Sequence, residues 1–231
     1  MNIFKSLNEI IFPERCIGCG ILGVALCMQC RKSWSHSRYL TQIAHSNTPV
    51  LTVISSVPYS DISQKILLAA KESHIKSADQ FVSQAITNSI QSALNFAPCD
   101  YLVPIPSRKS AARKRGRQFI EEMTAAASEL FSIPILNPLT HVRQVRDQSG
   151  LDSKARWNNL EGSLVADTKL VFSGKALLVD DLVTTGATLH EAARALRYAG
   201  IEVSGAVTAA VALTSKIPQV LRRDVSNRWT K

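Results

Sequence analysis

The chain is poor in glycine and proline and has no long hydrophobic run. Its 231 residues include 10 Gly and 9 Pro, a composition that excludes a fibrous or collagen-like protein. The longest apolar runs, at residues 206–213 and 176–179, fall far short of the roughly 20 residues that a membrane helix requires. We find no internal repeat and no low-complexity tract. We therefore expect a globular protein that does not span a membrane.

A secretion signal is also lacking. Residues 1–13 carry apolar side chains at Ile3, Phe4, Leu7, Ile10 and Ile11, the spacing of an amphipathic helix. They have neither the basic start nor the small-residue cleavage site of a signal peptide. We interpret the segment as a helix and predict a cytoplasmic protein.

Positive charge exceeds negative charge by a wide margin. The 27 Lys and Arg against 18 Asp and Glu give a formal net charge of +9, and the pI is about 9.5. Such a protein favours a polyanionic partner, either a pyrophosphate or a nucleic acid. Two clusters hold much of this charge: Arg108, Lys109, Arg113, Lys114, Arg115 and Arg117, and then Arg222, Arg223, Arg228 and Lys231. A solvated basic face is the alternative for either cluster.

Four of the five cysteines form two closely spaced pairs, Cys16 with Cys19 and Cys27 with Cys30. The spacing predicts a zinc site, because each CxxC turn directs two thiolates at one point and two turns complete a tetrahedron. Gly18 and Gly20 let the backbone curl around the metal. Since four cysteine ligands leave no open coordination position, the Zn²⁺ would be structural.

Other interpretations of the cysteine module remain open. Two disulfides are the alternative to zinc, and a reducing cytoplasm argues against them. His36 and His45 are further candidate ligands, which a four-cysteine site does not need. The module either binds DNA or fixes the N-terminal segment on the main domain, and we favour the second. Cys99, just before an apolar strand, is interpreted as a small buried residue.

Strand and helix patterns beyond residue 47 predict an α/β domain. Strands are expected at residues 50–57, 100–106, 175–179 and 202–213. Helices are expected at residues 62–70, which Ser60 and Asp61 can cap, and at residues 119–131 and 188–199, with a further helix capped by Ser77 and reaching Leu94. The last strand, helix and strand form a βαβ unit, which implies a parallel sheet covered by helices. We place the boundary here: residues 1–47 form an N-terminal helix and zinc module, and residues 48–231 form the α/β domain.

Polar residues follow the strand at residues 175–179, at the position where open α/β sheets bind ligands. Two adjacent carboxylates directly after a buried strand cost free energy if they bind nothing. Asp180 and Asp181 can accept hydrogen bonds from the two vicinal hydroxyls of a ribose. The loop that we call the phosphate cradle comes next: Thr184, Thr185, Gly186, Ala187 and Thr188. Its hydroxyls and inward backbone N–H groups at a helix start suit a 5′-phosphate. A surface turn with helix-capping threonines is the alternative.

Residues 179–188, VDDLVTTGAT, resemble the 5-phosphoribosyl-1-pyrophosphate (PRPP) signature of type I phosphoribosyltransferases. The wider chain, from Cys16 to about Leu213, is similar to the ComF family of competence-associated and GntX-type proteins. The further markers are the two CxxC pairs, Lys71, Val103 to Pro106, Arg115 with Gly116, Arg146, Gln148, Leu151, Arg156 and Asn159. The chain departs from the family at Arg117, Gln118 and Phe119, where an aromatic residue, Asn and Gln are usual, and at Glu72, where an aromatic residue commonly follows the lysine.

The resemblance implies a type I phosphoribosyltransferase-like fold that binds PRPP with Mg²⁺. Asp180 and Asp181 would take the catalytic positions, and the ligand would be bound by Lys71, Pro106, Ser107, Arg108, Arg115 and the phosphate cradle. Residues 108–117 would act as a mobile hood whose guanidinium groups close on the pyrophosphate. The prolines before them stiffen the backbone, and a cis peptide bond is one option there.

Two functions are compatible with this resemblance. One is an enzyme of nucleoside metabolism, a glycosyltransferase that moves phosphoribosyl from PRPP to an acceptor. The other is a non-catalytic module that senses a nucleotide or binds single-stranded DNA or DNA-uptake proteins. The sequence identifies no general base: His141 and His190 are candidates by their place along the chain, and surface histidines are the alternative. A polar run of Arg143, Arg146, Gln148, Arg156 and Asn159 provides either ligand contacts or a solvated surface.

Overall fold

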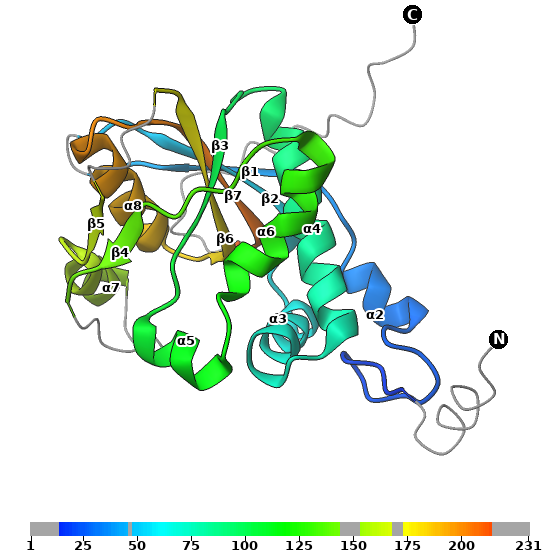
Figure 1. The fold of residues 1–231 in the computed structure, drawn as a ribbon. Coiled ribbons are helices and arrows are strands. Elements are labelled where there is room, and N and C mark those ends of the chain that lie inside the picture. Colours follow the sequence, from blue (N-terminus) through cyan, green and yellow to red (C-terminus); the bar gives the residue numbers. More distant parts are fainter. Residues whose placement is uncertain (1–13, 46–47, 144–152, 168–172, 214–231) are drawn as a thin grey trace, which may run out of the picture.

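The core of the protein is a five-stranded sheet with helices on both faces (Figure 1). The computed structural model describes residues 14–45, 48–143, 153–167 and 173–213. The strands, in spatial order, are β1 (Tyr39–Ile43), β2 (Leu51–Pro58), β7 (Glu202–Val211), β6 (Lys175–Val183) and β3 (Tyr101–Pro104). Strands β2, β7, β6 and β3 run parallel, and β1 is antiparallel to β2 at one edge. The predicted parallel sheet covered by helices is confirmed, with an antiparallel strand added at its edge.

Different sets of helices cover the two faces of the sheet. One face carries α3 (Asp61–Ser73), α4 (Lys76–Leu94) and α6 (Phe119–Phe131), and the other carries α8 (Ala187–Tyr198) with α7 (Ser153–Leu160), β4 (Leu139–His141) and β5 (Leu164–Ala166). Successive side chains of β6 point to opposite faces of the sheet and enter both cores. Leu177 and Val179 pack with α4, while Ala176 and Leu178 pack with α8. Two short helices, α2 (Met28–Ser33) and α5 (Lys109–Arg115), complete the described fold.

The starts of the first two long helices show one correct and one wrong prediction. Helix α3 begins after Ser60, which forms a reciprocal capping box with Ser63, as its sequence predicts. Helix α4 begins at Lys76 with Ile75 as its cap residue, so Ser77 lies inside the helix and does not cap it. The reason is the tight connection: α3 ends at His74 in the left-handed conformation (φ 54°), and the next helix follows at once.

Strand β6 is longer than its apolar run predicts. It continues to Val183 because β7 continues beside it, with Asp180 opposite Thr208 and Val183 opposite Val211. Asp180 and Asp181 therefore belong to the last part of a strand and not to the loop behind it. The backbone of the acidic pair is thus fixed by sheet hydrogen bonds.

The basic segment after β3 is helical where the sequence suggested a loop. Residues Lys109–Arg115 form α5, which ends at Gly116 in the left-handed conformation (φ 71°). All of its residues except Ser110 are Ala, Lys or Arg, which favour a helix, and the left-handed glycine closes it. Among the described residues no peptide bond is cis, so the prolines at positions 104 and 106 stiffen the chain in the trans form.

Several predictions fall outside the described residues. These are the N-terminal helix at residues 1–13, the markers Arg146, Gln148 and Leu151, the side chains of Lys109 and Arg156, and the C-terminal basic cluster. The domain boundary at residue 47 stays a prediction, and β1 joins the main sheet from the N-terminal side of it. Within the described part of the chain, no helix combines the length and the apolar character needed to cross a membrane.

Candidate functional site

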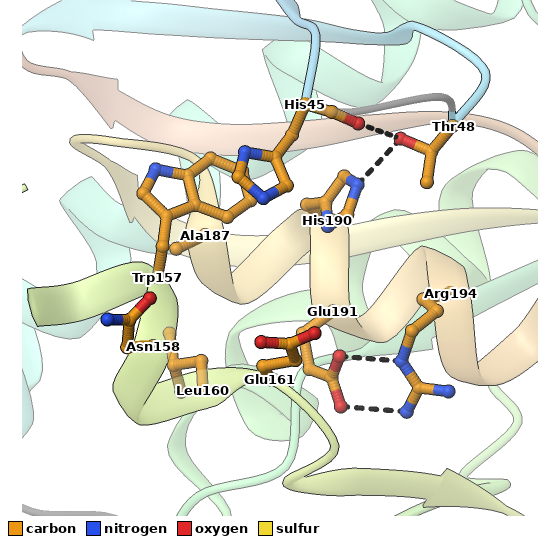
Figure 2. A pocket seen from close by; sticks show the side chains of 10 residues that line it. All are labelled: His45, Thr48, Trp157, Asn158, Leu160, Glu161, Ala187, His190, Glu191 and Arg194. Carbon is orange, nitrogen blue, oxygen red and sulfur yellow. Dashed lines mark hydrogen bonds and ion pairs between the residues drawn. The ribbon is translucent and has the colours of Figure 1, made fainter. Parts of the chain in front are cut away.

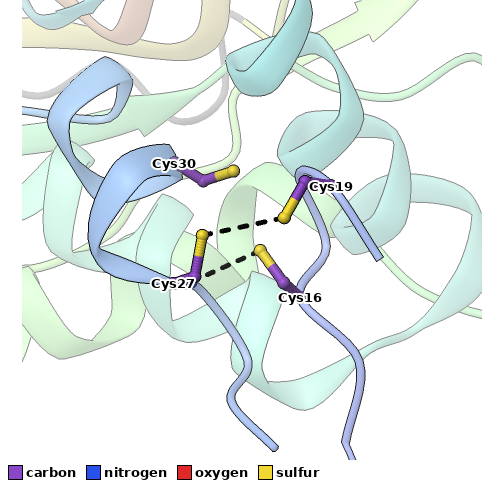
Figure 3. A group of neighbouring side chains, drawn as sticks. All are labelled: Cys16, Cys19, Cys27 and Cys30. Atoms are coloured by element: carbon purple, nitrogen blue, oxygen red, sulfur yellow. Dashed lines mark hydrogen bonds between the residues drawn. The ribbon is translucent and has the colours of Figure 1, made fainter. Parts of the chain in front are cut away.

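The four paired cysteines meet at one point beside α2 (Figure 3). Their sulfur atoms all lie within 4.8 Å of one another, and Cys19 Sγ is 3.7 Å from Cys27 Sγ. Zn–S bonds of about 2.3 Å in a tetrahedron separate the sulfurs by about 3.8 Å. The described cysteines are free thiols, and the arrangement fits a structural zinc ion, as predicted. His36 and His45 lie outside this cluster.

Electrostatics and close packing also fit a cation between the four sulfurs. Burial alone would raise the pKa of Cys16, but backbone N–H groups, that of Cys27 foremost, stabilise the thiolate and lower the pKa to about 6. Burial and the neighbouring sulfurs raise the pKa of Cys30 to about 12, so four thiolates do not coexist here without positive charge. A Cβ atom on Gly18 would lie 2.6 Å from the Cys30 sulfur, which explains the glycine.

The cysteine module is joined to the α/β domain by packing and by a hydrogen bond. Cys16, Cys30 and Trp34 belong to the same buried cluster as Ile66 of α3. The Lys65 ammonium donates a hydrogen bond of 2.8 Å to the carbonyl of Gly18. Through these contacts the module fixes the segment before β1 on the α/β domain, the role that we favoured from the sequence.

The predicted ligand-binding segments converge at the carboxyl edge of the parallel strands. Strand β3 ends opposite Val179 of β6 and leads into Pro106, Ser107 and Arg108. Strand β6 leads into the phosphate cradle and α8, and β2 leads into α3 with Lys71 in its last turn. Because parallel strands end at the same edge, segments far apart in the sequence are brought together there.

Lys71 and the acidic pair form the charged centre of this edge. Lys71 Nζ lies 2.6 Å from Asp181 Oδ2. Burial alone would lower the pKa of Lys71 and raise that of Asp181, but their mutual attraction outweighs it, so the pKa of the lysine is raised and that of the carboxyl is lowered. Burial and the charge of Asp181 instead raise the pKa of Asp180 well above its ordinary value. Of the two carboxyl groups, Asp181 is therefore the one that ionises more readily and Asp180 the one that keeps its proton to higher pH.

The structure divides the basic cluster into residues that face inward and residues that face solvent. Arg115 is one-tenth exposed, its Nε lies 3.3 Å from Glu72 Oε1, and its Nη1 is buried without a hydrogen-bond partner among the described residues. The positive charge of Arg115 repels that of Lys71 and acts to lower the pKa of the lysine. Arg115 therefore lies at the same edge of the sheet. Arg113 and Lys114 are exposed. Glu72, a departure from the family pattern, thus holds the inward arginine.

Arg117 is a structural residue and not part of a mobile hood. Its guanidinium contacts Asp79 at 2.7 and 2.9 Å, Glu122 at 3.2 Å and the carbonyl oxygen of Ala70. It also stacks 5.1 Å from the ring centre of Phe119, which is fully buried. The prediction that residues 108–117 act together is therefore wrong at Arg117, because acidic residues of α4 and α6 fix its side chain.

The phosphate cradle forms the start of α8 and packs against β1. Gly186 has φ 80° and caps the helix, and a Cβ atom there would lie 2.3 Å from the side chain of Ile43. The Thr185 hydroxyl accepts a hydrogen bond of 3.4 Å from the backbone N–H of Ala187. Thr184 and Thr188 are half-buried beside them. Both the conformation and the close contact with β1 require glycine at position 186.

The candidate general bases are engaged in contacts with the protein. His141 Nε2 donates to the carbonyl of Pro106 at 3.1 Å, and burial lowers the pKa of this histidine. His190 Nε2 lies 2.8 Å from the Thr48 hydroxyl. Arg143 donates to the carbonyl of Glu161 at the end of α7, and Asn159 lies in the same helix. The structure brings neither histidine into the acidic centre, and it gives Arg143 a local structural contact.

Comparison with known proteins defines the class. Residues 114–224 match the phosphoribosyl transferase domain family. Two solved structures are distantly similar: an adenine phosphoribosyltransferase, with 12% identity, a TM-score of 0.40 and coverage of 74% of this chain and 84% of that chain, and orotate phosphoribosyltransferase from Aeropyrum pernix, with 14% identity, a TM-score of 0.37 and coverage of 78% and 77%.

A curated relative specifies the family further. Competence protein F of Haemophilus influenzae (strain ATCC 51907 / DSM 11121 / KW20 / Rd) is 33% identical over 104 residues, which are 44% of this chain and 45% of that protein. The match thus spans less than half the length of the relative. Together with the domain match, it makes the chain similar to ComF-like phosphoribosyltransferases, the family that its motifs resemble.

Proposed function

We propose that the protein binds PRPP with Mg²⁺ at the carboxyl edge of its parallel strands. The observation that carries the proposal is the contact between Lys71 and Asp181, residues 110 positions apart that the fold brings within 2.6 Å. This contact joins a basic group suited to a pyrophosphate to an acidic group suited to ribose hydroxyls. The phosphate cradle begins directly after β6, the strand that carries Asp181.

Each part of the ligand has matching residues along this edge. The 5′-phosphate fits the backbone N–H groups and hydroxyls of the cradle at the start of α8. The ribose hydroxyls fit Asp180 and Asp181, one of which accepts as a carboxylate while the other also donates in its protonated form. The pyrophosphate fits Lys71, Arg115 and the segment from Pro106 to Arg108. The Nη1 of Arg115 is a buried donor that has no acceptor among the residues that the structure describes.

The acidic pair also fits a divalent cation. Mg²⁺ prefers oxygen ligands, which two adjacent carboxyl groups supply, and a bound cation would offset the repulsion from Asp181 that raises the pKa of Asp180. When bound, Mg²⁺ supplies counter-charge to the pyrophosphate leaving group. The protein's own contribution is to hold Asp181 ionised with Lys71 and to keep Asp180 beside it.

We further propose that the ribosyl C1 of the bound PRPP is transferred to an acceptor nucleophile. The bond from C1 to the pyrophosphate oxygen breaks, a bond from C1 to the acceptor forms, and pyrophosphate leaves with the electron pair. Positive charge develops on the sugar and negative charge on the leaving group, so Lys71 and Arg115 act where the leaving group gathers charge. A nucleobase or another amine is the class of acceptor. Its N–H proton is lost as the bond to C1 forms, and the departing pyrophosphate is the base that takes it, so the step needs no histidine.

A non-catalytic role is the second candidate. Arg113 and Lys114 are exposed on α5 beside the proposed site, and exposed basic residues favour single-stranded DNA. The curated relative is a competence protein, which is the reason to consider nucleotide sensing or DNA uptake for this chain. In either role we propose a cytoplasmic location, where free thiols persist and hold zinc.

Two arginines on α5 give a matched test of the site. Calorimetric titration with PRPP and Mg²⁺ is expected to show affinity at least about 10-fold lower for Arg115→Met than for wild type, as befits the loss of a charge-assisted contact. Arg113→Met, an exposed neighbour on the same helix, should bind as wild type does. Equal losses in both variants would favour a general charge effect and contradict the assignment.

Pyrophosphate release separates the enzyme from the binding module. Wild type is incubated with PRPP, Mg²⁺ and a panel of nucleobases and amines, and released pyrophosphate is measured. Release that depends on one acceptor class supports transfer. Binding of PRPP without release, together with salt-sensitive binding of single-stranded DNA, would favour the non-catalytic role.

A further inference from the structure

A second pocket lies between α7, α8 and the turn that joins β1 to β2 (Figure 2). Its volume is about 160 Å³, enough for a small heterocycle, and it shares only Ala187 with the phosphate cradle. Lys71, Asp180, Asp181 and Arg115 do not line it. It is therefore a site separate from the one proposed for PRPP.

Three aromatic rings form one wall of the pocket. The imidazole of His45 lies parallel to the indole of Trp157, with ring centres 3.9 Å apart and planes at 9°. His190 meets both rings edge-on, at 5.2 Å from His45 and 5.0 Å from Trp157. His45 is exposed and belongs to the turn, whereas Trp157 is half-buried on α7. This face of the indole thus accepts a flat heteroaromatic ring, and the ring that now covers it is at the surface.

The two carboxylates beside these rings are acceptors, while Asn158 and Arg194 of the same lining carry N–H donors. Glu191 is already satisfied, because Arg194 donates to it at 2.7 and 2.8 Å and the backbone N–H of Leu164 donates at 3.0 Å. Glu161 is exposed, and its carboxylate points into the pocket in Figure 2. A carboxylate only accepts hydrogen bonds, so the ligand group that pairs with Glu161 is a donor such as an exocyclic amine.

The histidine on α8 supplies a second acceptor. Thr48 Oγ1 lies 2.6 Å from the carbonyl of His45 and donates its only hydrogen there. It must then accept from His190 Nε2, which is 2.8 Å away. In the neutral ring the proton is on Nε2, and Nδ1 remains an acceptor. Burial lowers the pKa of His190, which favours the neutral form.

We propose that this pocket binds a nucleobase with an exocyclic amino group, stacked on Trp157 in place of the His45 imidazole and donating its amine to Glu161. Adenine is the probe that fits this chemistry, because a purine covers more of the indole than an imidazole does. The base belongs either to a free nucleoside or to single-stranded DNA. Both sources present the same ring and amine to the pocket.

The test uses Trp157 as its own reporter. In a chain with Trp34→Phe and Trp229→Phe, Trp157 is the only tryptophan, and its fluorescence is followed during titration with adenine and with hypoxanthine, a purine without the amine. We expect a saturable change with adenine and binding at least about 10-fold weaker with hypoxanthine. Calorimetry on the chain with all three tryptophans repeats the comparison, because Trp34 is buried and its substitution can disturb folding.

Three variants decide where the base binds. Glu161→Gln is expected to weaken adenine binding about 10-fold, and His45→Ala to strengthen it by removing the competing ring. Glu129→Gln, an exposed acidic residue on α6, is the matched control and should have no effect. Absence of saturable binding, or equal affinity in wild type and Glu161→Gln, would overturn the proposal.

The source of the base and the independence from the PRPP site are tested in parallel. Adenosine and an oligo(dA) strand are titrated at two salt concentrations. Equal affinity for adenine and adenosine with no gain for the oligonucleotide identifies a free nucleoside, whereas a gain that Glu161→Gln removes identifies single-stranded DNA. Oligonucleotide binding that Glu161→Gln leaves unchanged would contradict the pocket. An Asp180→Asn/Asp181→Asn chain should bind adenine as wild type does, and loss there would place the base at the PRPP site instead.

Discussion

Lys71 Nζ lies 2.6 Å from Asp181 Oδ2, although the two residues are 110 positions apart in the chain. The lysine comes from the last turn of α3 and the aspartate from the end of β6. For Asp180, the next residue, burial and the charge of Asp181 outweigh the attraction of Lys71, so its pKa is raised. The two adjacent carboxyl groups therefore have pKa values shifted in opposite directions.

Replacing Asp181 by Asn should destabilise the protein by about 1–3 kcal/mol, because Lys71 loses the partner of a charge-assisted hydrogen bond. The lowered pKa of Asp181 means that this stability is present above about pH 4, the ordinary pKa, and is lost as the pH falls through the folded-state pKa. Urea denaturation measures it. A double-mutant cycle with Lys71→Met is the control, since additive losses would show that the contact contributes nothing.

Replacing Asp180 by Asn should have the opposite pH dependence. The folded state keeps Asp180 protonated while the unfolded chain ionises it, so wild-type stability falls as the pH rises above about 4 towards the raised pKa. Asn imitates the protonated carboxyl and does not titrate. The free energy of unfolding of Asp180→Asn minus that of wild type should therefore grow between about pH 4 and about pH 7. A difference that stays constant over this range would contradict the raised pKa.

Replacing Arg117 by Met should cost about 1–3 kcal/mol of stability. The change leaves Asp79 without its guanidinium partner and the carbonyl oxygen of Ala70 without a donor. Arg113→Met, at an exposed position on α5, should change the free energy of unfolding by less than about 0.5 kcal/mol. Thermal or urea unfolding of the two variants distinguishes a fixed structural arginine from a member of a solvated basic face, for which both losses would be small.

Removal of the metal should loosen the N-terminal module. Protein purified under reducing conditions is expected to contain one zinc per chain, and a chelator or Cys30→Ser should lower the unfolding temperature, because Cys16 and Cys30 are part of the core around α3. Cys99→Ser is the matched control, since Cys99 lies outside the cluster. Zinc content near zero in wild type, or equal content in Cys30→Ser, would contradict the site.

The sequence predicted those features that depend on local patterns. The CxxC spacing predicted the sulfur cluster, Ser60 predicted the start of α3, and the apolar runs predicted β6 and β7. Each of these signals lies within a few residues of the structure that it predicts. The family motifs added Lys71 and Arg115, which no local pattern identifies as ligand-binding residues.

The features that the sequence did not predict depend on contacts between distant segments. The partner of Arg117 is Asp79 on another helix, and the residue that requires glycine at position 186 is Ile43 on β1. The pocket at Trp157 is formed by three elements that are distant in the sequence, and no motif identifies Trp157, Glu161 or His45 as neighbours. Glu72 was visible only as a departure from the family, and its role became clear once Arg115 lay beside it.

Binding of PRPP to the acidic pair is the most direct test of the central claim. Wild type and an Asp180→Asn/Asp181→Asn double variant are titrated with PRPP by calorimetry, each with and without Mg²⁺, with Glu129→Gln as a charge-matched surface control. We predict saturable, Mg²⁺-dependent binding by wild type and the control and a loss of at least about 100-fold in affinity for the double variant, as expected for two contacts to hydroxyls and a cation. Equal affinity in wild type and the double variant, or no binding by wild type, would contradict the assignment of this edge of the sheet to PRPP.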